Sequence, residues 1–210
     1  AGLLLALASC GGVHAASLFG VVTDRAAPTA VEAARQHLAR HPRDRILLRT
    51  PAQIQAASDR QLRQWLDADA VLAVSAFGDP ARRLIETLPA SRAGTVLAIN
   101  GEQRLNLLSR SRAGALASFP AETLRQLAGE SPPQAALEAA AAAPAAQHWL
   151  DARRTWQAGG SDNLNTLFKH LLAGSPLPSP RPEASLRLRV GAIERVDANA
   201  WDARLLPAGP

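Results

Sequence analysis

Short apolar runs alternate with amphipathic stretches through the first half of the chain. Four runs, over 18–23, 46–48, 70–74 and 95–99, are typical of buried strands. Between them, apolar residues recur every three or four positions in three stretches that begin near Pro28, Ala52 and Asp79, which predicts helices, the last one capped by Asp79. Because apolar strands alternate with helices, we expect an α/β fold, a parallel doubly wound (flavodoxin-like) domain over 17–110.

The second half has a different pattern. Residues 111–174 favour helices, over about 119–128 and 135–156, interrupted by prolines near 132 and at Pro144. Gly159-Gly160 predicts a turn, after which Ser161 or Asp162 would cap a helix that Gly174 ends. Residues 175–210 are expected to be a proline-rich linker and the start of a truncated further domain, with a strand over 186–193.

Residues 1–16 are an uncharged run rich in leucine and alanine, which is typical of part of a secretory signal. Because the chain has no methionine, its true start would lie upstream. Cleavage could follow Ala15, or Cys10 could be lipidated as in a bacterial lipoprotein. We therefore expect export to the periplasm, with membrane contact only through the signal or a lipid anchor. If 1–16 is instead a buried strand or helix, the protein would be cytoplasmic.

Charge and cysteine content narrow the function classes. The chain has 23 basic and 18 acidic residues, but the arginines are spread among acids and aromatic residues are few, which argues against a nucleic-acid partner. Cys10 is the only cysteine, so one chain can form neither a disulfide nor a thiolate metal site by itself.

In doubly wound sheets, ligands bind beyond the carboxyl ends of the strands. We call this edge of the sheet the strand-end rim, and its candidate ligand-binding residues are Asp24, Arg25, Ser75, Phe77, Asp79 and Asn100. The first strand is not followed by a glycine-rich phosphate loop, and the sequence contains no Gly-x-Ser-x-Gly elbow. No catalytic residue is therefore assigned.

The spacing of the histidines in the sequence predicts no metal site. His37 and His41 stand one turn apart at the end of a helix and could share a metal, but no third ligand has a matching spacing. The helix dipole also favours histidine at such an end. His148 and His170 are expected to stand alone on their helices.

One stretch carries a family resemblance: Trp156-x-x-Gly159-Gly160-x-Asp162-Asn163-Leu164-x-x-Leu167. It resembles the amino-terminal region of the cobaltochelatase large subunit (CobN type) and of the related magnesium chelatase H subunit. Thr50-Pro51, the run 66–71 and Phe77-Gly78-Asp79 are similar to that family's first α/β domain. The resemblance covers most of the mature chain but only the first part of a family protein.

The resemblance implies a parent protein that binds a tetrapyrrole and inserts or removes its metal, which would be cobalt, magnesium or iron. It implies a place in cobalamin biosynthesis or in haem and metal acquisition, with chelatase partner subunits or envelope proteins as partners. The family's catalytic residues lie beyond this fragment, so the fragment would be non-catalytic alone. The alternative is an exported, non-catalytic α/β domain that binds a ligand or partner at the strand-end rim.

Overall fold

The computed structural model describes residues 15–174, 177–178 and 201–202, and it contains a mixed sheet with strand order β6-β5-β4-β3-β1-β2-β7. The four central strands are mutually parallel, and β5, β6 and β7 pair antiparallel at the two sides. The strands are β1 Ser17–Val21, β2 Arg45–Arg49, β3 Ala70–Val74, β4 Thr95–Ile99, β5 Arg110–Ser111, β6 Gly114–Ala115 and β7 Trp201–Asp202.

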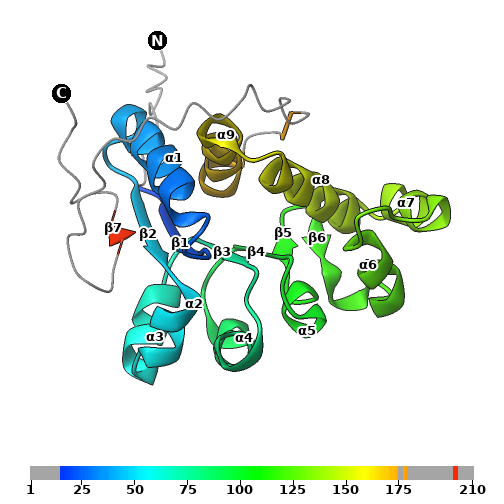
Figure 1. Cartoon of the computed structure of the whole chain (residues 1–210), viewed down its shortest axis with the longest axis horizontal. Helices are drawn as coiled ribbons and strands as arrows, with labels where there is room; N and C mark the ends of the chain where they lie inside the picture. The colour runs from blue at the N-terminus through cyan, green and yellow to red at the C-terminus, as the bar shows by residue number, and fades with distance from the viewer. Residues whose placement is uncertain (1–14, 175–176, 179–200, 203–210) are drawn as a thin grey trace, which may run out of the picture.

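Helices cover both faces of this sheet. Figure 1 shows α1, α8 and α9 on one side of it and α2, α3, α4 and α5 on the other. The helices are α1 Ala27–Arg40, α2 Pro51–Ala56, α3 Asp59–Leu66, α4 Gly78–Thr87, α5 Gln103–Asn106, α6 Ala121–Leu127, α7 Gln134–Ala141, α8 Pro144–Ala158 and α9 Gly160–Ala173. The predicted α/β fold with a parallel doubly wound sheet, followed by a mostly helical segment, is confirmed.

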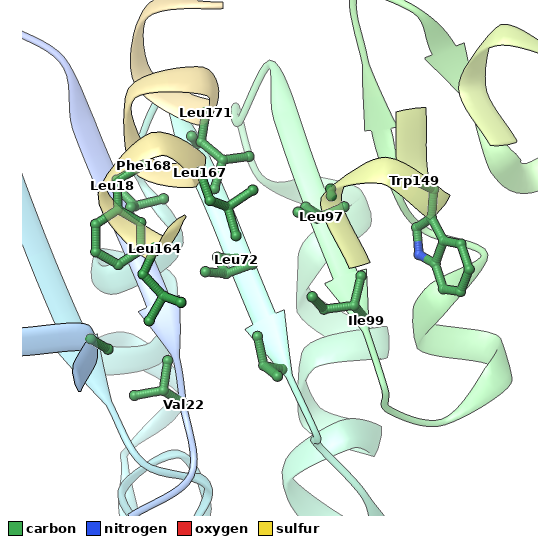
Figure 2. Close-up of a cluster of buried hydrophobic side chains, with 14 of the residues drawn as sticks. Leu18, Val22, Leu72, Leu97, Ile99, Trp149, Leu164, Leu167, Phe168 and Leu171 are labelled. Atoms are coloured by element: carbon green, nitrogen blue, oxygen red, sulfur yellow. The ribbon is translucent and has the colours of Figure 1, made fainter. Parts of the chain in front are cut away.

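The strands bury side chains on both faces because successive residues of a strand point in opposite directions. In β1, Leu18 belongs to the core under α1 and α9, whereas Phe19 belongs to the core above α2, α3 and α4. Leu164 and Phe168 of α9 lie over β1 and β3 (Figure 2). This two-sided burial explains why the strands are almost entirely apolar.

The helices after residue 110 share the core of the α/β domain. Trp149 of α8 is buried and donates a hydrogen bond from its indole Nε1 to the Ala98 carbonyl at 2.7 Å. Phe168 of α9 is fully buried in the same core cluster as Leu18 and Leu72. Side chains of the helical segment 111–174 therefore pack into the same core as those of residues 17–110.

Three local predictions were wrong. The single helix expected from Ala52 is two, because Ser58 forms a capping box with Gln61 and starts α3. Asp79 does not cap α4; Phe77 is the N-cap, and Asp79 lies in the first turn. Neither Ser161 nor Asp162 caps α9, which begins directly after Gly159.

The remaining predictions concern the end of α9, the edge strands and the two ends of the chain. Gly174 ends α9 in a left-handed conformation (φ 65°), as predicted. The hairpin of β5 and β6 was not predicted, because each strand has only two residues. The signal segment apart from residues 15 and 16, Cys10, most of the proline-rich linker and the strand over 186–193 lie outside the described residues. Within the described ranges, no helix is both long and apolar enough to cross a membrane.

Candidate functional site

Two loops meet at the strand-end rim. The Ser75 amide, just after β3, donates to the Ile99 carbonyl at the end of β4 (3.0 Å). In return, the Glu102 amide donates to the Ala76 carbonyl (3.1 Å). The structure therefore brings the predicted residues Ser75 and Asn100 together, since each directly follows one of two adjacent parallel strands.

Both residues have an unusual backbone. Ser75 has φ 52° and Asn100 has φ 53°, in the left-handed region that costs a residue with a side chain free energy. Gly101 is required beside them, because a Cβ there would stand 2.9 Å from the Ala76 carbonyl oxygen. Such conformations occur preferentially at binding sites and tight turns. The loop after β4 is thus held in a defined shape by its close contact with the loop after β3.

A buried arginine of α8 supports the loop after β4. Arg153 of α8 donates from Nε to the Asn100 side-chain Oδ1 (3.1 Å) and from an amino group to the Gly129 and Ala128 carbonyls. Its side chain is 5% exposed, and burial lowers the pKa of Arg153 from its usual value. Sequence reasoning missed Arg153, since 53 residues separate it from Asn100.

The amino end of α4 is occupied by the protein itself. The Gly78 amide donates to the Glu102 carboxylate at 2.7 Å, at the place where helices of doubly wound folds commonly hold an anion. At the start of α1, the Thr23 carbonyl accepts hydrogen bonds from the amides of Ala26 and Ala27. Groups of the chain itself therefore already accept from one amide at the start of α4 and from two at the start of α1.

The remaining rim residues face solvent. Phe77 is 57% exposed, and Asp79 forms an exposed ion pair with Arg82 at 2.7 Å. Asp24 and Arg25 follow β1 and are exposed, and their side chains form no hydrogen bond or ion pair with the residues that the structure describes. The rim thus has a rigid part at Ser75 and Asn100 and an open part at Phe77, Asp24 and Arg25.

The motif of the family resemblance forms the corner between α8 and α9. Gly159 (φ 66°, ψ −164°) and Gly160 (φ 73°) have backbone conformations that glycine adopts most easily. The Asn163 side chain donates to the Gly159 carbonyl at 2.9 Å. Trp156 and Leu164 pack into the core on either side, while Asp162 is exposed in the first turn of α9. The motif residues together turn the chain back over the sheet.

The histidine pair at the end of α1, His37 in its last turn and His41 at its C-cap, is a structural contact. The rings of His37 and His41 stack with centroids 4.6 Å apart. His37 is 1% exposed, and its Nε2 lies 2.8 Å from the Asp44 carboxylate, whose other oxygen accepts from the Ala16 amide. Burial lowers the pKa of His37, although Asp44 opposes that shift. His37 thus holds the end of α1 against the start of β2.

The other two histidines meet, so the expectation that they stand alone was wrong. Nε2 of His148 on α8 contacts Nε2 of His170 on α9, and the ring centroids are 4.6 Å apart. Nδ1 of His148 lies 3.4 Å from the Ser111 hydroxyl. Burial, and next the charge of His170, lower the pKa of His148 to about 4. We call these two residues the interhelical histidine pair.

A small hollow lies beside this pair. His148 lines it together with Ser109, Arg110 and Ser111, and it has room for about one water molecule. It is far too small for a tetrapyrrole. Among the described residues, no three side chains of His, Cys, Asp or Glu come together as metal ligands.

The fold defines the class of protein, an α/β domain with a doubly wound sheet whose strand ends form one rim. A scan against models of known protein families found no match, and a search of curated proteins found no significant one.

Proposed function

We propose that this chain is the amino-terminal α/β domain of a protein of the cobaltochelatase and magnesium chelatase kind. The parent protein binds a tetrapyrrole and inserts or removes cobalt, magnesium or iron. The observation that supports this most directly is the corner between α8 and α9. Gly159 and Gly160 both have positive φ there, so the motif that carries the resemblance has a defined structural use.

In this proposal the domain contributes a binding surface rather than chemistry. A chelatase needs a concave apolar site for a flat ring and a base for the pyrrole protons. The hollow near His148 does not fit a ring, so those tasks fall to residues elsewhere in the parent protein. The rigid part of the rim, supported by Arg153, would then contact the rest of that protein or a partner subunit.

The test is to sequence the coding region beyond Pro210 and to express its longest product. Haem, cobalamin and a metal-free porphyrin are then titrated while the visible absorption bands of each tetrapyrrole are followed. We expect a long downstream core and a saturable spectral shift that residues 15–178 alone do not give. A stop codon directly after Pro210, together with unchanged spectra, would refute the proposal.

Export to the periplasm is a second part of the proposal and is tested separately. The full coding region, carrying a carboxyl-terminal tag, is expressed in a bacterial host and the cell fractions are compared. We expect the product in the periplasmic or membrane fraction, and the mass of its amino terminus distinguishes cleavage after Ala15 from acylation at Cys10. Cys10→Ser is the matched control, since it blocks only acylation. Retention of the uncleaved product in the cytoplasm would refute export.

The alternative function is ligand or partner binding without any chelatase core, and the exposure of Phe77 beside the rigid rim favours it. A photo-crosslinking amino acid at position 77 would then capture an envelope protein. The same probe at Arg43, which is exposed between α1 and β2 at the opposite end of the strands, is the control. Equal capture at the two positions would remove this alternative.

A further inference from the structure

The interhelical histidine pair offers two nitrogen ligands at one point. His148 and His170 are 22 residues apart and lie on different helices, yet their Nε2 atoms are in contact. Their rings are tilted by 40° to each other rather than stacked in parallel. The two rings therefore meet edge to edge through nitrogen atoms, unlike the stacked His37 and His41.

One of the two neutral tautomers of His148 places a free electron pair on Nε2. A neutral imidazole carries one N–H and one lone pair, on opposite nitrogens. When Nδ1–H of His148 faces the Ser111 hydroxyl, the lone pair lies on Nε2 and points at His170. This arrangement, in which the outer nitrogen has a hydrogen-bond acceptor, is the usual one for histidines that bind metals.

Two imidazole nitrogens can face each other in contact when either a shared hydrogen atom or a metal ion lies between them. A proton gives an N–H···N hydrogen bond. A metal ion takes both lone pairs and needs further ligands, which water can supply because both rings are only half-buried. Asp151, one turn after His148 on α8, is the nearby negative charge that acts on this ring.

We propose that His148 and His170 bind one divalent transition-metal ion, zinc, nickel or copper, through their Nε2 atoms. Imidazole nitrogen suits these ions, whereas magnesium and calcium prefer oxygen ligands. Metal–nitrogen bonds of about 2.0–2.1 Å in tetrahedral geometry place the two nitrogens about 3.3 Å apart. The two nitrogens lie closer together than that, so metal binding requires the side chains to rotate apart. Water completes the coordination, so binding is reversible.

The proposal does not depend on the proposed function, because it rests only on the contacts that His148 and His170 make. It places the site between α8 and α9, which the Gly159-Gly160 corner brings together. An exchangeable ion held there by two histidines is suited to transient loading rather than to stabilising the fold.

The test uses the full chain, without any histidine tag, in a Cys10→Ser background that removes the competing thiol. After treatment with a chelator, zinc, nickel and copper are each titrated by calorimetry, with magnesium as the negative control. We expect one transition-metal ion per chain, and at least tenfold weaker binding in His148→Gln and in His170→Gln. His41→Gln is the matched control, because it removes an exposed histidine of the other pair and should leave binding unchanged.

A second measurement keeps the proposal testable if a variant does not fold. In the native protein labelled with ¹⁵N, zinc should shift the Nε2 resonances of both His148 and His170 together, and copper should show two coordinated nitrogens by electron paramagnetic resonance. Absence of a stoichiometric site, or equal binding by native protein and both glutamine variants, would overturn the proposal. The contact would then be a hydrogen bond that joins α8 to α9.

Discussion

The two histidine pairs differ in how the chain brings their rings together. His37 and His41 stand four residues apart at the end of α1, and their rings stack while Nε2 of His37 lies 2.8 Å from the Asp44 carboxylate. His148 and His170 come from two helices and meet through their nitrogens. Helical spacing alone pointed to the first pair as a possible metal site, whereas tertiary packing produced the second. Spacing along one helix is therefore a poor guide to which histidine rings meet through their nitrogen atoms.

The largest effect is expected from His37→Ala. It removes a buried ring and leaves the Asp44 carboxylate without its partner, so the free energy of unfolding should fall by about 2–4 kcal/mol. Urea denaturation followed by circular dichroism measures it. His41→Ala, on the exposed side of the same pair, should change stability by no more than about 0.5 kcal/mol. Equal losses in the two variants would show that Asp44 does not distinguish the rings.

An intermediate effect is expected from Gly159→Ala, which breaks the corner that sets His170 opposite His148. The conformation at Gly159 (φ 66°, ψ −164°) is strained for alanine, so unfolding should become easier by about 1–3 kcal/mol. In ¹⁵N spectra, the imidazole resonances of His148 and His170 should shift while those of His37 stay in place. A shift at His37 as large as that at His170 would contradict independent packing of the two pairs.

The smallest effect is expected from acid. The pKa of His37 is lowered, and that of His148 is lowered to about 4, so both rings bind protons more readily in the unfolded chain, near pH 6.5. Their contribution to stability is complete above about pH 6.5 and is lost as the pH falls from there towards 4. We expect His148 to account for about 1 kcal/mol between pH 7.5 and 5, because solvent screens a partly exposed ring.

Comparing native protein with His148→Gln by urea denaturation at both pH values measures that share. The variant should lose less stability on acidification than the native protein does. An identical loss in both would mean that His148 does not titrate differently on folding.

The parallel sheet could be predicted because each strand is a short run of apolar residues between turn signals, such as 70–74 between Asp69 and Ser75. The helix break at Ser58 was missed even though a capping box has a sequence signature, since Ala52 to Leu66 also fits one helical period. Side-chain pairs that meet only when helices pack together leave no pattern in the nearby sequence. Arg153 with Asn100 and His148 with His170 are separated by 53 and 22 residues.

The sequence predicted where the strand-end rim lies, but not which groups of the chain already form hydrogen bonds there. The rule that ligands lie beyond the strand ends located Ser75 and Asn100 correctly at one edge, but it could not show that Glu102 occupies the start of α4. That contact depends on the loop after β4 folding over the loop after β3. The pairing arises from two hydrogen bonds between main-chain groups, which every residue type can form.

The antiparallel strands at the two sides of the sheet limit how the protein can associate. An open edge strand exposes a row of unpaired amides and carbonyls that can recruit a strand of another molecule and lead to aggregation. Here β5 and β6 cover the edge of β4, and β7 pairs with part of β2. Since β6 is only two residues long, it offers very little template for growth. On this side, the sheet therefore offers the strand of another molecule little edge to extend.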